Sequence, residues 1–407
     1  MSELNIESEP NLEVAEVFRT YGDDFLDCWG GSLSRAQKKA FDDICACRTA
    51  ALGGHVDQCE QCGHCAISYN SCRNRSCPKC QGAARAQWLA EREAELLPVE
   101  YFHVVFTLPQ PIARLALHNA RVIYSILFRA ASETLLTIAA DPQHLGAAIG
   151  FLAVLHTWGQ NLHLHPHIHC VVPGGGISPD NSRWIPCRQY RKSFFLPVKV
   201  LSRFFRKRFL RHLRKAFQKG KLRFHGEGEP LAQPKVFEAL CRKAGQTKWV
   251  VYAKPPFGGP EQVLKYLARY THRVAISNGR LLSLENGQVR FRWRDSRHNN
   301  RSSVMTLDAV EFIRRFLLHV LPAGFVKIRH FGLLANRNRR QALALCRTHL
   351  SATTPDINAL LTEQQKSALS RSCPQCKYGT LHVVARHVAV EPANSCAPLA
   401  CAHIDSS

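Results

Sequence analysis

The sequence has 407 residues, 45% of them hydrophobic, which suits a globular protein of two or three domains and excludes a disordered chain. Its 54 lysines and arginines against 31 aspartates and glutamates give a net charge of +23, so nucleic acid is the expected partner. A membrane-spanning protein is disfavoured, because the longest apolar run, Leu145–Leu155, has about eleven residues and a bilayer needs roughly 20.

The N-terminal residues, MSELNIESEP, are acidic and polar and lack the layout of a signal peptide. We therefore expect a cytoplasmic protein. Cysteines stay reduced in that compartment, so clusters among the 17 cysteines indicate metal binding rather than disulfide bonds.

A helical segment over about residues 12–48, interrupted at 30–32, leads into a block rich in cysteine. Cys59-x2-Cys62 and Cys77-x2-Cys80, with 14 residues between them, have the spacing of a four-thiolate zinc site, and we predict a structural zinc ion there. A second metal ion or a mixed ligand set stays open, because the block holds further candidates: Cys45, Cys47, His55, His64, Cys65 and Cys72.

The next elements predict an α+β fold with an antiparallel sheet and helices on one face. Residues 101–108 read as a strand, 112–139 as a long helix and 151–158 as a second strand. The stretch NLHLHPHIHCVVPGGG at 161–176 follows, with four histidines at alternate positions. Because proline favours strand starts, the strand is expected to begin near His167. His167 and His169 then share a face, and two imidazoles held this way can bind one divalent cation.

Two basic segments are candidates for contact with DNA phosphates. Residues 197–224 predict an amphipathic helix with an apolar residue every fourth position, at Phe205, Phe209, Leu213 and Phe217. Cations occupy much of the remaining surface, among them Arg206, Lys207, Arg208 and Arg211. An ordinary solvated helix is the alternative. A strand near 289–295 alternates Arg292 and Arg294 with aromatic residues, so that one face is cationic.

A predicted helix at 261–271 carries Tyr266 and Tyr270 four residues apart on one face. Such tyrosines are usually packing residues, but a divalent cation beside them would let a phenol oxygen attack a phosphodiester and form a phosphotyrosine. Near the C-terminus, Cys373-x2-Cys376 is half a zinc site at most, with His382 as a further candidate ligand.

Together these motifs resemble the HUH endonuclease superfamily, and more closely the two-tyrosine transposases of the insertion sequence 91 type. The similarity covers about residues 30 to 345 and rests on NSCRNRSCPKCQ, HPHIHCVVPGGG, YAKPPFGGP and YLARYTHRVAIS. Ser76 departs from the pattern, since a histidine is expected there.

The resemblance implies a DNA transposase that nicks and rejoins single-stranded DNA through a tyrosine-5′-phosphate intermediate in rolling-circle transposition. Tyr266 and Tyr270 would be catalytic, and Mg²⁺ or Mn²⁺ would be bound by His167, His169 and a third ligand. Gln160 is the expected third ligand, because it lies seven residues before His167 where related enzymes often keep a carboxylate or amide. His103, His163 and His165 are the alternatives.

The resemblance also implies an organisation into a helical and zinc-binding domain (1–97), an HUH-type catalytic domain (98–345) and a tail with the CxxC (346–407). The partners would be single-stranded DNA at the element ends and target in the bacterial nucleoid, with a host helicase as a candidate because no Walker motif is present. A rolling-circle replication initiator, a non-catalytic zinc-dependent DNA-binding regulator and a histidine-rich metal phosphohydrolase are the competing hypotheses.

Overall fold

The structure, a computed structural model, describes residues 12–80, 82–187, 196–254, 261, 264–265, 275–295, 301–352 and 372–387. Its α-helices are α1 Val14–Thr20, α2 Gly22–Trp29, α3 Arg35–Ala46, α4 Gly82–Ala94, α5 Gln110–Ala113, α6 Ala116–Ala140, α7 Val198–Gln218, α8 Pro234–Gln246, α10 Ala309–Leu317 and α11 Arg339–His349. Its strands are β1 Gly54–Cys59, β2 Cys65–Tyr69, β3 Tyr101–Thr107, β4 Gly150–Trp158, β5 Leu164–Pro173, β6 Gly175–Ile177, β7 Trp184–Pro186, β8 Val251–Lys254, β9 Leu281–Glu285, β10 Gln288–Asp295, β11 Arg301–Asp308, β12 Ile328–Gly332 and β13 Leu381–His387.

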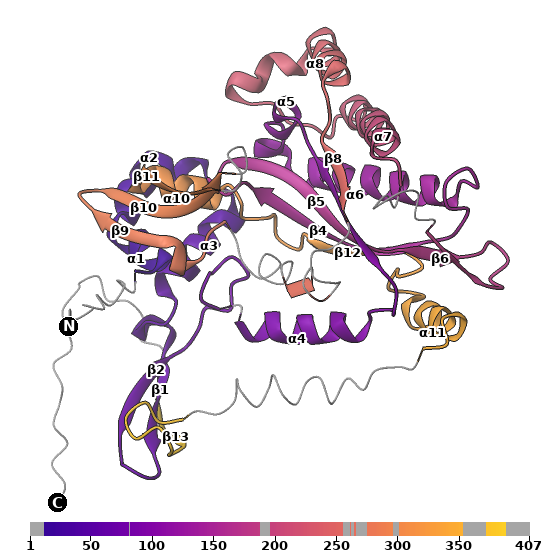
Figure 1. The fold of residues 1–407 in the computed structure, drawn as a ribbon. Coiled ribbons are helices and arrows are strands. Elements are labelled where there is room, and N and C mark those ends of the chain that lie inside the picture. Colours follow the sequence, from indigo (N-terminus) through magenta and orange to yellow (C-terminus); the bar gives the residue numbers. More distant parts are fainter. Residues whose placement is uncertain are drawn as a thin grey trace, which may run out of the picture.

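A five-stranded antiparallel sheet in the order β12-β4-β5-β3-β8 forms the centre of the molecule (Figure 1). Alternate side chains of its strands, such as Phe106, Leu155 and Ile168, are fully buried against α6 and α7 on one face. α6 is long and apolar enough to cross a membrane, but 67% of its apolar window is buried inside the protein, as in a core helix. The α+β class predicted from the sequence is confirmed.

The opposite face of the sheet packs against α4, below the sheet in Figure 1. Trp88 of α4 shares a small hydrophobic cluster with Val154 of β4 and Val171 of β5. The cluster also contains Leu264, which belongs to the described part of the predicted 261–271 helix. Because side chains alternate along a strand, His156 and His169 lie on this same face as Val154 and Val171.

The N-terminal helices do not form a separate domain core. α1, α2 and α3 pack with α10 and the three-stranded sheet β9-β10-β11, where the rings of Phe18 and Phe316 are 5.3 Å apart. The helical reading of residues 12–48 and its break at 30–32 match α1 to α3 and the short 3-10 turn Gly30–Ser32. This core joins sequence segments more than 250 residues apart.

A second small sheet, β2-β1-β13, stands apart from the centre (Figure 1). β1 and β2 form a hairpin, and β13 from the C-terminal segment pairs with the other edge of β1. The residues of the predicted C-terminal tail that the structure describes at 372–387 therefore lie beside the N-terminal cysteines.

β5 begins at Leu164, three residues earlier than expected, so Pro166 lies inside a central strand. The prediction missed an irregularity in the ladder: the β4–β5 register shifts between His156 and Trp158, opposite this proline. On the side of β5 that faces β3, Pro166 pairs through its carbonyl, which accepts a hydrogen bond from the Leu108 amide at 3.1 Å. A missing N–H is tolerated at such a position.

We expect His319 to make folding stability depend on pH. This side chain is 1% exposed, lies 3.3 Å from the Thr157 hydroxyl, and donates from Nε2 to the Leu162 carbonyl at 3.0 Å. Burial lowers its pKa from 6.5 to about 4. The unfolded chain then binds the proton more tightly, so stability present above pH 6.5 is lost as pH falls toward 4. For this one group the loss between pH 7 and pH 5 is about 2 kcal/mol.

Urea unfolding of His319→Gln at pH 7 and pH 5 checks this, since glutamine keeps a donor for the Leu162 carbonyl and has no proton to gain. The variant should lose less stability than the wild type between the two pH values. His118→Gln, at an exposed histidine, is the control and should behave as the wild type does. Equal losses in all three proteins would contradict the role of His319.

Candidate active site, basic surface and cysteine clusters

Three histidines from two adjacent strands converge on the face of the central sheet that carries α4. His156 of β4 is directly opposite His167 of β5 in the antiparallel ladder, and His169 follows two residues later on the same face. The ligand nitrogens of the three rings lie within 4.8 Å of one another. His156 and His169 are almost fully buried, at 3% and 4% exposure. Three imidazoles at these distances can bind a single metal ion.

Polar contacts made by the Nδ1 atoms orient the rings of His167 and His169. Nδ1 of His167 donates to the His165 carbonyl at 2.6 Å, which leaves Nε2 as the ligand atom. Nδ1 of His169 lies 2.7 Å from Nε2 of His103 on β3, so its Nε2 is likewise the atom left for a metal. His103, one of the alternative ligands considered from the sequence, therefore contacts a ligand and orients it.

The histidines are neutral at physiological pH. Burial lowers the pKa of His167 to about 3 and that of His103 to about 4, and it holds the pKa values of His156 and His169 well below 6.5. A metal ion needs the unprotonated ring, so this burial prepares the cluster for binding. The nitrogen donor set fits Mn²⁺ better than Mg²⁺, which prefers oxygen ligands and retains its waters.

His156 was missed by the sequence analysis, which proposed Gln160 as the third ligand. β4 ends at Trp158, and Gln160 lies in the following loop. Its backbone carbonyl accepts a hydrogen bond from Arg280 at 2.6 Å. Assignment of Gln160 as a metal ligand stays a prediction. The signal for His156 was available, because a strand at 151–158 paired in antiparallel register with 167–172 brings residue 156 opposite His167.

Tyr266 and Tyr270 lie outside the described residues. Leu264, one of the two described residues just before Tyr266, is 2% exposed and packs with Val154 and Val171 on the histidine face of the sheet. Lys265 beside it lies near Glu93 of α4 and lowers the pKa of that carboxyl, although burial raises the same pKa more. This part of the predicted helix is therefore held on the face that carries the metal candidates.

The basic residues predicted to contact DNA have different surroundings. Arg208 and Arg211 of α7 lie near Glu133 of α6, at 3.8 and 3.5 Å, and Arg206 donates to the Thr247 carbonyl at 3.4 Å. Lys207 of α7 and Arg292 and Arg294 of β10 are exposed. Whether any of these six residues touches DNA stays a prediction.

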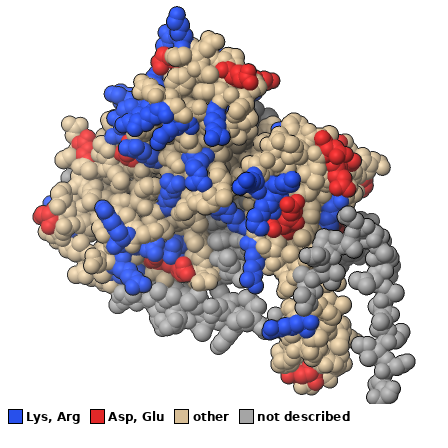
Figure 2. Space-filling view, turned by 180° about the vertical axis from the view of Figure 1, so that it is seen from behind, with Lys and Arg blue, Asp and Glu red and all other residues tan. Residues whose placement is uncertain are grey.

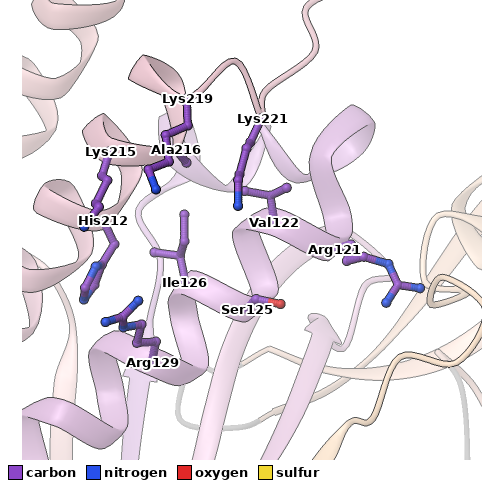
Figure 3. Close-up of a pocket in the computed structure, with 10 residues that line it drawn as sticks. All are labelled: Arg121, Val122, Ser125, Ile126, Arg129, His212, Lys215, Ala216, Lys219 and Lys221. Atoms are coloured by element: carbon purple, nitrogen blue, oxygen red, sulfur yellow. The ribbon is translucent and has the colours of Figure 1, made fainter.

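Lysines and arginines gather over α7 on the rear face of the molecule (Figure 2). There, α6 and α7 enclose a cavity of about 350 Å³ (Figure 3), with Val122, Ile126 and Ala216 as apolar lining residues. Its lining also includes His212 and five cationic residues, namely Arg121, Arg129, Lys215, Lys219 and Lys221. We call this cavity the α6–α7 groove. It lies on the opposite side of the central sheet from the histidines.

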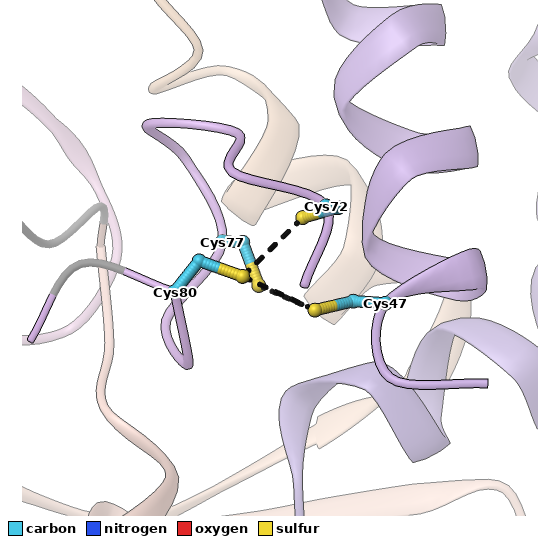
Figure 4. A group of neighbouring side chains, drawn as sticks. All are labelled: Cys47, Cys72, Cys77 and Cys80. Atoms are coloured by element: carbon cyan, nitrogen blue, oxygen red, sulfur yellow. Dashed lines mark hydrogen bonds between the residues drawn. The ribbon is translucent and has the colours of Figure 1, made fainter. Parts of the chain in front are cut away.

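Eight of the described cysteines form two clusters, and the four cysteines of the predicted single tetrad are divided between them. Cys77 and Cys80 meet Cys47 and Cys72 (Figure 4), whereas Cys59 and Cys62 meet Cys373 and Cys376. Spacing pointed to two neighbouring CxxC pairs, but β1 and β2 lead the first pair away from the second and toward β13. Each of the four predicted cysteines thus lies in a cluster that could hold a metal ion, but the two pairs lie in different clusters.

The cluster of Cys47, Cys72, Cys77 and Cys80 has the dimensions of a zinc site. A tetrahedron with Zn–S bonds of about 2.3 Å has sulfur–sulfur edges of about 3.8 Å. The Sγ atom of Cys80 lies 3.2 Å from that of Cys47 and 3.6 Å from that of Cys72, and the Cys77–Cys47 distance is 3.6 Å. A hydrogen bond with Cys77 is the main cause that lowers the pKa of Cys72 to about 5, whereas burial is the main cause that raises the pKa of Cys47 to about 11.

Comparison with known proteins identifies two family models. One, described as "Putative transposase", matches residues 150–342, and the other, described as "Transposase zinc-binding domain", matches residues 17–108. The chain is 55% identical over 377 residues to the "Putative transposase y4qJ" of Sinorhizobium fredii (strain NBRC 101917 / NGR234), covering 91% of this chain and 94% of the relative.

The chain is also 29% identical over 348 residues to the transposase for insertion sequence element IS801 of Pseudomonas savastanoi pv. phaseolicola, covering 81% of this chain and 78% of the relative. Among solved structures, the copper-bound conjugative relaxase TrwC in complex with oriT DNA matches 42% of this chain and 68% of that chain, at 14% identity and a TM-score of 0.22. That score is too low to support an argument.

We expect His156→Ala to weaken Mn²⁺ binding, because it removes one of three imidazole donors. The loss should be at least as large as the roughly 10- to 100-fold that follows removal of an outer-shell partner. Titration calorimetry with Mn²⁺ alone measures it. His163→Ala, at an exposed histidine of the same stretch, is the control and should leave the affinity unchanged. Wild-type affinity in His156→Ala would remove His156 from the ligand set.

Proposed function

Because the chain belongs to the insertion sequence 91 type transposases with an N-terminal zinc-binding domain, we propose that it cuts and rejoins single-stranded DNA through a tyrosine-5′-phosphate intermediate. The single observation that carries the proposal is the cluster of His156, His167 and His169 on the face of the central sheet that packs against α4, with Leu264 of the tyrosine segment buried on that face. We propose that this segment brings a tyrosine nucleophile to the three histidines.

In the proposed cleavage, the phenol oxygen of Tyr266 or Tyr270 attacks a DNA phosphorus atom and loses its proton. A bond forms between that oxygen and phosphorus, the bond from phosphorus to the 3′ oxygen breaks, and the departing 3′ oxygen takes up a proton. Rejoining is the reverse reaction with a different 3′ hydroxyl. The number of phosphodiester-type bonds is conserved in each step, so no ATP is required.

The three histidines would hold the divalent cation, and Mn²⁺ is the better fit of the two predicted ions. A bound cation would polarise the phosphodiester and offset the negative charge that develops on its oxygens. His103 and the His165 carbonyl keep the ligand rings in place. Such hydrogen bonds to a ligand ring fix its orientation and so support metal binding.

Two tyrosines suit transposition, because two DNA ends can be held in turn. A nuclease that cuts one strand needs one tyrosine to hold one DNA end. Transposition also joins a released end to a second DNA end, which a second tyrosine could hold. We further propose that the substrate is single-stranded DNA at the element ends and target in the cytoplasm, with unwinding supplied by a host helicase. The net charge of +23 supports a nucleic-acid substrate.

The proposal predicts a covalent protein–DNA adduct. Wild-type protein incubated with Mn²⁺ and a labelled single-stranded oligonucleotide from an element end should give a product that survives denaturing electrophoresis. The double variant Tyr266→Phe/Tyr270→Phe should give none, because phenylalanine lacks the attacking oxygen. Tyr252→Phe, on β8 of the same sheet, is the matched control and should retain adduct formation.

Each single tyrosine variant should still form an adduct if either phenol can attack alone. The tyrosine mechanism would be wrong if the wild type formed no adduct with either Mn²⁺ or Mg²⁺, or if the double variant formed one. Product released without any covalent link would favour a metal phosphohydrolase.

A further inference from the structure

The cluster of Cys59, Cys62, Cys373 and Cys376 brings together two parts of the chain more than 300 residues apart. The Sγ atoms of Cys59 and Cys376 are 3.7 Å apart, and those of Cys62 and Cys373 are 3.6 Å apart. These distances match the roughly 3.8 Å edge of a tetrahedral zinc–thiolate site. The matching zinc-binding family model ends at residue 108, so it does not include the two C-terminal cysteines.

Strand pairing holds the two halves of this cluster in register. β13 pairs with β1 from Gly54 opposite His387 to Cys59 opposite Leu381. The turn before β13 is shaped as a metal-binding knuckle: the Cys373 amide donates to the Gly379 carbonyl at 2.8 Å, and the Gly379 amide donates to the sulfur of Cys376 at 3.3 Å. A Cβ atom at Gly379 would lie 2.4 Å from the sulfur of Cys59, so glycine permits the close approach.

Hydrophobic packing is too sparse to hold this sheet together alone. β13 has no buried residue, β2 alternates exposed and half-buried positions, and Ile67 and Val384 are 60% and 55% exposed. Cys59 and Cys373, in contrast, are 2% and 1% exposed. A small module with so little apolar core needs a metal ion or a comparable cross-link to be stable.

We propose that Cys59, Cys62, Cys373 and Cys376 bind a zinc ion of their own, and that this ion fastens the C-terminal segment to the N-terminal module. The site is separate from the cluster of Cys47, Cys72, Cys77 and Cys80. It joins two segments that lie on either side of the central sheet in the sequence. The inference does not rest on the proposed tyrosine chemistry.

The experiment compares zinc content per full-length chain, by plasma mass spectrometry after dialysis, in variants from each half of the site. Cys62→Ser and Cys376→Ser should each lose one zinc ion relative to the wild type, and the double variant should also lose one, because both cysteines serve the same ion. The control Cys28→Ser/Cys65→Ser removes two exposed cysteines outside both clusters and should lose none.

Limited proteolysis supplies the second readout. Cleavage within residues 372–387 should accelerate in Cys62→Ser, although that substitution lies in the N-terminal module. Far-ultraviolet circular dichroism should stay close to the wild type in both single variants, since the cores of the central sheet and of α1 to α3 do not contain these cysteines. Unchanged zinc content in Cys376→Ser, a loss of two ions in the double variant, or unchanged proteolysis in Cys62→Ser would each overturn the proposal.

A different observation, the charge of the α6–α7 groove, supports a second inference. Glu133 of α6 pairs with Arg129 of the groove at 2.8 Å, and it also contacts His212 of the groove at 2.8 Å and Arg211 outside the groove at 3.5 Å. Among the described residues, Lys215, Lys219 and Lys221 have no ion-pair partner, so the groove keeps an excess of positive charge. An anionic ligand would offset that excess.

The lining of the groove favours the backbone of double-stranded DNA. Its ten lining residues include no Phe, Tyr or Trp, so it offers no ring on which the bases of a single strand could stack. Arg121 and Arg129 are eight residues apart on α6, about 12 Å, which spans roughly three to four phosphates of one strand. Cations without aromatic platforms are typical of contacts to duplex phosphates.

The groove also continues toward the catalytic strand. Arg121 and Lys221 line a neighbouring cavity of about 600 Å³ that reaches Arg35 and Leu164, the first residue of β5. The geometry points to the α6–α7 groove as a sequence-independent site for the duplex that flanks the single-stranded substrate. This second inference adds a surface that the proposed cleavage reaction does not use.

Duplex binding measured by fluorescence anisotropy over a range of salt concentrations tests the groove, independently of strand cleavage. Lys215→Ala/Lys219→Ala/Lys221→Ala should reduce the slope of log K against log salt by about 3, because each lost phosphate contact contributes about 0.9. The control Lys235→Ala/Lys243→Ala/Lys248→Ala removes the same charge from exposed lysines outside the groove and should change the slope less.

Equal slopes for the two triple variants would overturn the inference. So would displacement of the duplex by inorganic phosphate beyond the effect of chloride at the same ionic strength, since the groove would then be a site for a small anion.

Discussion

The antiparallel pairing of β4 with β5 is the constraint on which the candidate active site depends. It sets His156 opposite His167 and leaves Leu155 and Ile168 on the other face, in the core under α6 and α7. A slip of one residue would turn the imidazoles into that core and the apolar side chains out of it. The register is therefore fixed by hydrophobic burial on one face, and the metal ligands on the other face are positioned by that burial. Burial on their own face of the sheet keeps the rings unprotonated.

Sequence reasoning recovered what is local in this fold. The alternation around Ile168 identified His167 and His169, and hydrophobic periodicity identified the helices of residues 12–48 and the long α6. His156 was not recovered, because its role depends on the register between two strands. The strand start was misplaced at Pro166 for a related reason, since the irregular ladder opposite it is a property of the pair and not of one strand.

The cysteines and the basic helix show the same limit for long-range contacts. A zinc site requires four sulfur atoms close together in space, whatever their separation in the sequence. Sequence proximity paired Cys59 with Cys77, whereas the structure places these two cysteines in different clusters. On α7 the charge pattern identified a cationic helix, but it did not show which of its cations form ion pairs with acidic residues of other elements. Arg211 meets an acid 78 residues away on α6, whereas Lys215, one turn further along α7, meets no acid among the described residues.

The pairing of β1 with β13 has a consequence for the order in which the protein is made. Cys62 and Cys373 are separated by 311 residues, and a ribosome adds roughly 5–20 residues per second, so the first two thiols wait roughly 15 to 60 s for their partners. During synthesis the N-terminal hairpin has a free strand edge and an incomplete ligand set. The small sheet can therefore be completed only in chains that have been translated through β13. Chains whose translation stops earlier keep reactive thiols and an unpaired strand edge.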